Sequence, residues 1–269
     1  MYARLILILP LVLFLGVTYL VPFIDIARLS VTMPDVGLQQ YQTALGDPLI
    51  LDVFVRTLRI CLGVTLLSVA AAYAVTFLWV RGSAVTSSLV ELCVMIPFWI
   101  SVLTRAFGWL SMLSNRGVIN TWLTKWGIVE QALPLVRNEF GVVVGMAHYL
   151  IPFAVFPLAT AMRNIDERVL MAAQGMGASR ARVFWQVFVP MTASGLLGAL
   201  LLVFVFSIGF YITPSILGGG KSVMMAELIY LRIFQIPDWG LAAAMSVTLM
   251  VCVGGLLVVL IRRYAKVSL

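Results

Sequence analysis

The sequence predicts an all-α integral membrane protein with six transmembrane helices. Of its 269 residues, 62% are hydrophobic and only 11% are charged, and the mean hydropathy is +1.07. A water-soluble chain carries roughly 25% charged residues, so lipid must cover much of this surface. Apolar stretches of about 20 residues, the length that crosses the hydrocarbon of a bilayer, occur six times. We therefore expect one transmembrane domain over residues 1–269, with no soluble ATPase domain beside it.

The expected spans follow the apolar stretches in chain order. They cover residues 5–24, 60–80, 88–110, 140–162, 191–213 and 239–261. The first stretch is too long and too poorly flanked for a cleaved signal peptide. The third contains Glu91 and Arg105, and the fourth contains the single histidine, His148. The last two contain no charged residue.

Small side chains recur at helical spacing within several spans. In a bilayer, helices associate through close backbone contacts, because lipid removes the hydrophobic drive between them. We expect one such contact at Ser194 with Gly198 and Ala199. The second span has an expected close-packing face made of Ala70, Ala71, Ala72 and Ala74.

The net charge of +7 indicates a membrane topology and no nucleic-acid partner. The basic residues form no stripe interleaved with exposed aromatic residues, which is the pattern of a nucleic-acid surface. Membrane proteins concentrate Lys and Arg in short cytoplasmic loops, close to the ends of the spans. With both termini cytoplasmic, the two sides of the membrane hold equal numbers of basic residues, but the inner segments are about half as long in total. Arg81, Arg163 and the Arg262-Arg263-Lys266 cluster then lie at the favoured positions. We therefore expect an N-in, C-in topology.

Nothing in the sequence predicts catalysis, a disulfide or a bound metal. Cys61, Cys93 and Cys252 each lie inside an apolar run with no histidine nearby, and a free cysteine usually packs as a small apolar residue. The segment 218–221 (GGGK) lacks the spacing of a phosphate-binding loop. One histidine within a span supports no catalytic triad. We expect this chain to bind no cofactor.

The polar segment between the fourth and fifth spans, residues 163–190, predicts two short helices joined by a sharp turn. Asp166 is placed to cap the first helix and Ser179 the second, since both side chains accept hydrogen bonds from a first helical turn. Gly175 and Gly177 end the first helix, because glycine adopts a sharp reversal easily. Pro190 then redirects the chain into the fifth span.

Two adjacent alanines in this segment favour docking on a partner protein. Ala172 and Ala173 precede Gly177, and Pro190 lies thirteen residues beyond that glycine. Small side chains let the backbone of a helix approach a groove closely. The expected docking residues are Met171, Ala172, Ala173, Gly175, Gly177, Ala178 and Pro190. An ordinary connecting loop that contains Ala and Gly by chance is the alternative.

At these residues the chain resembles the permease subunits of type I ABC importers, and within them the spermidine/putrescine permease group. The resemblance covers most of the chain from about Thr57 onward. Further matching segments are residues 97–101 (PFWIS), 117–120 (GVIN), 138–141 (NEFG), 217–220 (LGGG) and 238–239 (DW). The loop of this family usually begins with Glu, where this chain has Met171.

The resemblance implies a multi-pass inner-membrane subunit that forms a translocation pathway and has no catalytic activity. Its implied partners are an ABC ATPase dimer, which uses ATP and Mg, a second permease chain of similar sequence, and an extracytoplasmic solute-binding protein. A polyamine such as putrescine or spermidine is the expected cargo. The group is also similar to permeases for opines, phosphonates, ferric iron and thiamine, and these remain alternatives.

Candidate pathway or gate residues are ionisable and aromatic side chains in or beside the spans. A charge within a bilayer is costly and is often functional, while aromatic faces attract cations. The candidates are Arg105, Trp99, Trp109, Tyr211, Glu227, Asp238 and Trp239. Glu91 is the only acidic residue deep in the spans, and a single carboxylate is few for binding a polycation.

Most ionisable residues also have a structural interpretation. Arg105 can extend to the membrane interface. Glu91 can form an ion pair with Arg81 or with a neighbouring helix, and His148 can be a hydrogen-bonded packing residue. For Glu227 and Asp238, with Trp239 beside them, the alternative is that they are ordinary loop residues whose charges are exposed to solvent.

Two other functional classes compete with an importer subunit. A self-sufficient secondary transporter or channel would need intramembrane groups for a coupling ion and often an inverted repeat, and the sequence shows neither clearly. An assembly or scaffold protein would leave the 163–190 segment without a role.

Overall fold

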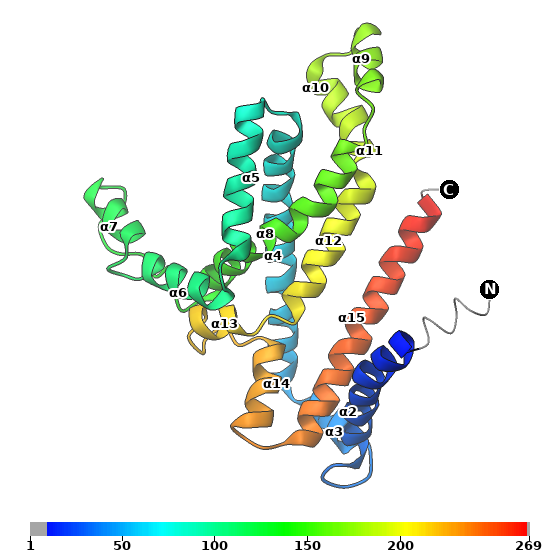
Figure 1. Ribbon diagram of the computed structural model, residues 1–269. Coiled ribbons are helices and arrows are strands. Elements are labelled where there is room, and N and C mark those ends of the chain that lie inside the picture. Colours follow the sequence, from blue (N-terminus) through cyan, green and yellow to red (C-terminus); the bar gives the residue numbers. More distant parts are fainter. Residues whose placement is uncertain (1–9, 268–269) are drawn as a thin grey trace, which may run out of the picture. The chain divides into compact units, whose positions relative to one another are not determined.

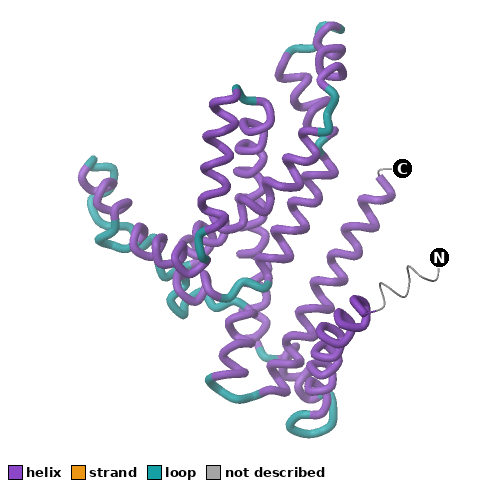
Figure 2. The backbone as a smooth tube through the Cα atoms, viewed as in Figure 1, coloured by secondary structure: helices purple, strands orange, loops and turns teal. Residues whose placement is uncertain are grey.

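The computed structural model describes residues 10–267, with side chains up to Arg262, and this part of the chain contains helices and loops without a strand (Figure 2). The first predicted span, residues 5–24, therefore begins outside the described residues. The side chains of Arg263 and Lys266, which belong to the expected cytoplasmic cluster, also lie outside them. Two compact units make up the described part. One consists of the residues up to Val55 together with those from Met225 onward, and the other is Arg56–Met224.

The first unit is built around the C-terminal helix. Its helices are η1 (Gly16–Leu20), α2 (Val21–Thr32), α3 (Gln39–Gly46), the start of α4 (Pro48–Arg81), α14 (Met225–Phe234) and α15 (Trp239–Val267). Helix α15 packs against α2, α3 and α14. A Cβ atom added at Gly240 would lie 2.1 Å from the carbonyl oxygen of Met33, so glycine is required for this close approach.

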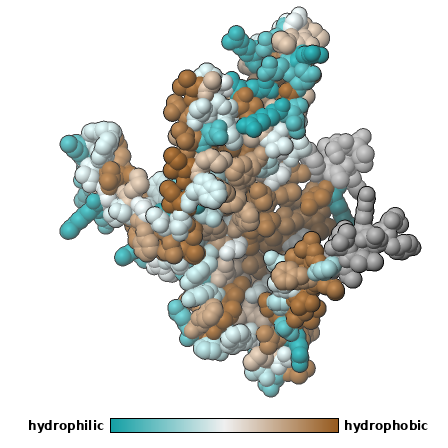
Figure 3. All heavy atoms as spheres, in the orientation of Figure 1, coloured by the Kyte–Doolittle hydropathy of each residue, from teal (hydrophilic) through white to brown (hydrophobic). Residues whose placement is uncertain are grey.

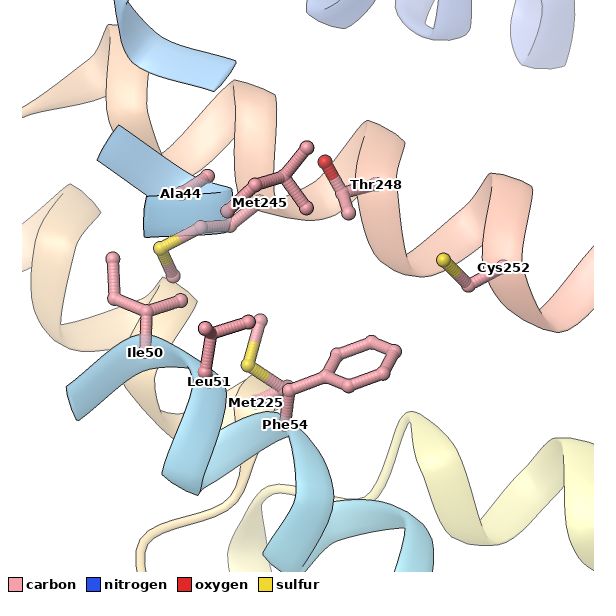
Figure 4. A pocket seen from close by; sticks show the side chains of 9 residues that line it. Ala44, Ile50, Leu51, Phe54, Met225, Met245, Thr248 and Cys252 are labelled. Atoms are coloured by element: carbon pink, nitrogen blue, oxygen red, sulfur yellow. The ribbon is translucent and has the colours of Figure 1, made fainter. Parts of the chain in front are cut away.

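A small apolar pocket of about 70 Å³ lies in this unit. Figure 4 shows side chains of α3, α4, α14 and α15 around it, among them Phe54, Met225 and Cys252. The hydroxyl of Thr248, which also lines it, donates to the carbonyl oxygen of Ala244 at 2.8 Å in its own helix. Because this hydroxyl is already bonded within α15, the pocket has no feature that favours a charged solute.

The second unit is built around α8. Besides the rest of α4 it contains α5 (Ala84–Trp99), α6 (Val102–Leu113), α7 (Val118–Lys125), α8 (Glu139–Arg163), α9 (Glu167–Gly175), α10 (Arg180–Val183), η2 (Phe184–Phe188), α11 (Val189–Met191), α12 (Ala193–Ile208) and α13 (Ile212–Leu217). Helix α8 packs against α5, α6, α12 and α13 (Figure 1). The hydroxyl of Ser68 on α4 also donates to the carbonyl oxygen of Ala147 on α8, at 3.4 Å.

Four described helical stretches are long and apolar enough to cross a membrane. They are Pro10–Thr32, Pro48–Arg81, Glu139–Arg163 and Trp239–Arg262. Two bent pairs raise the total to six when each pair counts as one span. One pair joins α5 to α6 and α7 with a bend of 104°, and the other joins Arg180–Met191 to α12 with a bend of 61°.

The predicted third span, residues 88–110, differs from the structure because the helix breaks inside it. Helix α5 ends at Trp99, and Ile100 and Ser101 are extended, with ψ angles of 134° and 143°. Pro97 lies in the last turn of α5, and proline cannot donate a backbone hydrogen bond within a helix. The predicted fifth span is also shorter than expected, because α12 ends at Ile208.

Hydrophobic side chains cover the outward face of α5, whereas hydrophilic ones gather over α9 and α10 (Figure 3). On α5 the exposed residues include Leu89, Leu92 and Ile96. An apolar face of this kind is expected to contact lipid, because nothing else in the described unit covers it.

The small residues that form helix contacts are partly different from those predicted. On α4 the buried stripe contains Thr57, Cys61, Thr65, Ser68, Ala72 and Thr76. Ala70 and Ala74 are exposed, because the helical period turns them away from Ala72. On α12, Ser194 is exposed, and the buried small residues are Gly195 and Ala199.

We predict that Gly195→Ala destabilises the protein whereas Gly198→Ala does not. A Cβ at Gly195 would lie 2.4 Å from the Cβ of Ala161 and 2.8 Å from the carbonyl oxygen of Pro157, so α8 and α12 must separate. Overpacking of this kind costs about 1–3 kcal/mol. At Gly198 the nearest atom is 3.6 Å away, and the lower backbone entropy of alanine is expected to stabilise by up to about 1 kcal/mol.

Thermal unfolding in detergent, followed by fluorescence-detected size exclusion, measures both variants. Equal midpoints for the two would contradict the assigned contact.

Candidate functional site

The two short helices predicted in the 163–190 segment are present, with both predicted caps. Asp166 Oδ1 accepts a hydrogen bond from the backbone N–H of Arg168 at 2.9 Å. Ser179 Oγ accepts one from the N–H of Arg182 at 3.3 Å. Gly177 between them has a φ angle of +87°, which side chains disfavour. Local side-chain chemistry therefore fixes the shape of this segment.

A π-helical turn and a bend follow the second short helix. Residues Phe184–Phe188 form the π-helix η2, which the sequence did not predict. Pro190 lies in the short helix α11, and the chain then bends by 61° into α12. The buried hydroxyl of Thr192 donates to the carbonyl oxygen of Val189 at 2.8 Å at this bend.

Two arginines attach the 163–190 segment to the ends of the spanning helices. Arg81, the last residue of α4, pairs with Glu167 at 2.7 Å, and its guanidinium lies 5.4 Å from the ring centre of Phe188. Arg163, the last residue of α8, lies 4.8 Å from the ring centre of Trp79 on α4. The predicted pairing of Arg81 with Glu91 is therefore wrong. The first turn of α9 brings Glu167 to Arg81, while Glu91 is exposed on α5.

An aromatic cluster holds the second half of the segment against α4. The ring of Phe77 meets those of Phe184 and Phe188 edge to face, with 5.4 Å between ring centres in each pair. The hydroxyl groups of Tyr73 and Thr192 share a hydrogen bond of 2.9 Å. Edge-to-face packing of buried rings adds about 0.5–1.5 kcal/mol per pair to their burial. The segment is therefore packed against the helices along much of its length.

One face of α9 is left exposed by this packing. Ala173 is only 7% exposed and faces the body of the unit, whereas Met171 is 60% and Met176 84% exposed. Ala172 is exposed beside them, as are Gly175 and Gly177, while Ala178 is half-buried. The predicted docking residues thus divide into an outward group and the inward Ala173. Pro190 is exposed at the far end of the segment.

Arg105 lies beside an aromatic pocket within the same unit. Its guanidinium is 4.1 Å from the ring centre of Tyr149 on α8. Its Nε and Nη1 atoms are buried and have no hydrogen-bond partner among the described residues. An unsatisfied charged donor is costly when buried, so these two atoms lack an acceptor that the described residues do not supply.

The pocket itself has a volume of about 260 Å³. Its lining consists of Val102, Tyr149, Gly209, Phe210, Tyr211 and Ile212. The rings of Tyr149 and Phe210 meet at 4.9 Å. Tyr149 was not among the predicted pathway residues, and its position next to His148 was the only signal for it.

The interpretation of His148 as a packing residue is confirmed. Trp109 Nε1 donates to His148 Nδ1 at 3.2 Å, and the two rings meet edge to face. Trp109 therefore fixes the imidazole and belongs to the contact between α6 and α8. Among the candidate pathway residues, Arg105 and Tyr211 lie around Tyr149, and Trp99 lies exposed at the end of α5.

The remaining candidates belong to the other unit. Glu227 is buried within α14, so its interpretation as solvated loop charge is wrong: α14 begins at Met225 and includes it. Asp238 caps α15, because its Oδ1 accepts from the N–H of Leu241 at 3.1 Å. Trp239 is the first residue of that helix and is exposed.

The described residues thus form an integral membrane protein whose polar segment is packed on the spanning helices and leaves one face of α9 exposed. The chain belongs to the family of binding-protein-dependent transport system inner membrane components, whose model matches residues 5–266. It is therefore a multi-pass inner-membrane subunit of an ABC importer, and such a permease is not itself catalytic.

Particular relatives extend over most of the chain. The spermidine/putrescine transport system permease protein PotB of Escherichia coli is 29% identical over 217 residues, which are 81% of this chain and 79% of PotB. The osmoprotective compounds uptake permease protein GgtC of Synechocystis is 26% identical over 95% of this chain and 96% of its own. A chain in the crystal structure of a bacterial ABC transporter involved in alginate import matches with a TM-score of 0.76 at 16% identity, over 100% of this chain and 96% of its own. The last likeness shows the fold.

We predict that Phe188→Ala loosens the 163–190 segment, whereas Trp185→Ala does not. Phe188 is 3% exposed and contacts Phe77 and Arg81, while Trp185 is 68% exposed in the same turn. Removing a buried phenylalanine side chain costs about 3–5 kcal/mol.

Limited trypsin digestion measures the change, because the segment contains the exposed arginines Arg168, Arg180 and Arg182. We expect faster cleavage there in the Phe188 variant only. An equal cleavage rate in both variants would show that this ring does not fix the segment.

Proposed function

We propose that the chain lines the translocation pathway of an importer for small polyamines, with putrescine and spermidine as its cargo. The observation that carries this proposal is the similarity to PotB over four fifths of the chain. The aromatic pocket beside Tyr149 supports it, since ring faces attract ammonium groups. The proposed importer also contains a second permease chain of similar sequence, an ABC ATPase dimer that uses ATP and Mg, and an extracytoplasmic solute-binding protein.

The proposed orientation places both termini and the 163–190 segment in the cytoplasm. Arg81 and Arg163 end their helices next to Arg168, Arg180 and Arg182 of the segment. At the other end of α4, Arg56 and Arg59 lie against the carboxylate of Glu139, which offsets part of their charge. Arg116, Lys125, Arg137 and Lys221 lie in the longer connections on the opposite side. The proposed orientation therefore rests on Arg81 and Arg163, which lie directly at span ends, where the positive-inside rule gives basic residues most weight.

The proposed docking surface for the ATPase is the exposed face of α9 at Met171 and Ala172, together with Met176 directly after the helix. Small and flexible side chains suit a groove on a partner, and methionine adapts to irregular surfaces. Arg81 and the Phe77 cluster join this segment to α4, and α8 leads directly into it. Movement of a docked ATPase would therefore be passed to the spanning helices.

We predict that Ala172→Trp releases the ATPase. The added ring would stand on the exposed face of α9 and hold the partner away. Gln174→Trp is the matched control, because residue 174 lies about 200° around the helix from residue 172. Co-purification in mild detergent measures the outcome, and retention of the ATPase by the Ala172 variant would overturn the docking surface.

Met171→Glu, which restores the usual acid of the family, is expected to increase the amount of ATPase recovered.

Arg105 favours a second candidate cargo, one that carries an anionic group, as opines and phosphonates do. Its buried Nε and Nη1 atoms have no partner among the described residues, and its guanidinium lies against the ring of Tyr149, which lines the pocket. Arginine binds carboxylate and phosphate oxygens in a paired geometry. A polycation, in contrast, would be repelled by this guanidinium.

Substitution of Arg105 distinguishes the two cargoes. In proteoliposomes with the solute-binding protein, we expect Arg105→Gln to keep or increase the stimulation of ATP hydrolysis by putrescine and spermidine. If the cargo is anionic, we expect Arg105→Gln to lower the apparent affinity for it by roughly 10- to 100-fold, because a hydrogen bond to a charged group contributes that much. Arg105→Lys, which keeps the positive charge, should recover part of this affinity. Arg28→Gln, an exposed arginine of the other unit, is the control. Stimulation by an anion alone would reject polyamines as the cargo.

A further inference from the structure

The segment that follows α5 runs across the direction of the spanning helix. Helix α5 has 16 residues, which give a length of about 24 Å, close to the hydrocarbon thickness of about 30 Å. The chain then turns by 104° into α6 and α7. Figure 1 shows α6 and α7 leading sideways from α5. If α5 crosses the bilayer, α7 lies nearly parallel to the membrane surface and near its level.

Helix α7 presents an apolar stripe that the described residues do not cover. Val118 and Trp122 on α7, and Trp126 directly after its last residue, follow one another at intervals of four residues and are 57%, 55% and 65% exposed. The two indole rings lie 5.0 Å apart, centre to centre. Ile128, just beyond the helix, is also exposed. Lys125 lies on the same side of the helix as Trp122 by its helical position.

The opposite face of α7 is fixed by one buried side chain. Asn120 is 1% exposed, and its Nδ2 atom donates to the carbonyl oxygens of Ser114 and Leu133 at 3.1 and 2.9 Å. Its Oδ1 atom accepts from the N–H of Leu133 at 2.8 Å. These bonds hold α7 between the end of α6 and the following loop. The tryptophan stripe is therefore kept on the outer face of a fixed helix.

We propose that α7 is an interfacial anchor whose tryptophan stripe inserts into the boundary between phospholipid headgroups and acyl chains. Tryptophan concentrates at this level of a bilayer, and helices with one apolar and one polar face lie in its plane. Ile96 and Trp99 on α5 and Phe107 on α6 are exposed apolar residues as well. Lys125 and the exposed Arg116 supply positive charge for lipid phosphates.

A membrane surface fits these features better than a protein partner. The orientation of α7 follows from the bend after α5, and the residue types are those of the aromatic belt of membrane proteins. The anchor would also hold α6 in place, because α7 packs against α6. Since α6 carries Arg105 and Trp109, the lipid contact would position the wall of the aromatic pocket.

Fluorescence quenching by lipid tests the proposal. The three native cysteines are first replaced by serine or alanine. In this background, Trp122→Cys and Trp126→Cys each provide a single cysteine, which is labelled with a nitrobenzoxadiazole dye. The full chain is reconstituted into phosphatidylcholine vesicles with and without phosphatidylglycerol. We expect blue-shifted emission that a lipid carrying a spin label near its headgroup quenches more than one labelled deep in the acyl chain. Thr124→Cys, on the polar side of α7, is the matched control and should report water.

Two results would overturn the anchor. Water-like emission at both tryptophan positions would show that the stripe stays in solvent. Blue-shifted emission that neither lipid quenches would show that protein covers the stripe, for example a second copy of the chain. Because a substitution at either tryptophan can disturb folding, Val118→Cys on the same stripe is labelled as well, with both tryptophans kept. Water-like emission from the dye at residue 118, or emission that neither spin-labelled lipid quenches, would contradict the proposal.

Discussion

In a bilayer, helices gain little by burying apolar surface against one another, because lipid tails are equally apolar. The contact between α8 and α12 at Gly195 therefore has a particular importance. A missing side chain lets the backbone of α12 approach Ala161 and Pro157, and dispersion forces between well-packed atoms then hold the pair. Helices α5, α6 and α13 pack on the same central helix. The arrangement of the second unit thus depends on close approach to α8.

Both candidate functional regions are attached to α8. Tyr149, halfway along it, supports Arg105 and forms a wall of the aromatic pocket. At its C-terminal end, Arg163 rests on Trp79 and the chain passes into the 163–190 segment. A rigid helix between a pocket and a docking surface is what the proposed transmission of movement requires. The segment's exposed α9 face and the pocket are separated by helix that is largely buried.

The parts of the structure that the sequence predicted are governed by local chemistry. The caps at Asp166 and Ser179 and the reversal at Gly177 follow from the hydrogen bonds and backbone angles of those residues alone. The lengths of the apolar stretches are likewise set by the thickness of the hydrocarbon core of the bilayer. His148 was assigned correctly as a packing residue, although its partner Trp109 came only from the structure.

The parts that were missed depend on contacts between distant residues. Arg81 bonds to Glu167 and not to Glu91, because the start of α9 folds back to the end of α4. The buried face of α4 differs from the predicted one because small apolar residues occur all around that helix, and lipid accepts any of them. The break after Trp99 depends on two extended residues that the hydropathy pattern does not distinguish.

The contacts of the 163–190 segment come from both sides of it along the chain. Tyr73 and Phe77 precede it, whereas Thr192, which bonds to Tyr73, follows it. During synthesis on the ribosome, the last of these contacts can form only after residue 192 has emerged. A truncated nascent chain would hold the segment less firmly than the finished protein does. The packing at this end of the segment is therefore completed only after α11 has been synthesised.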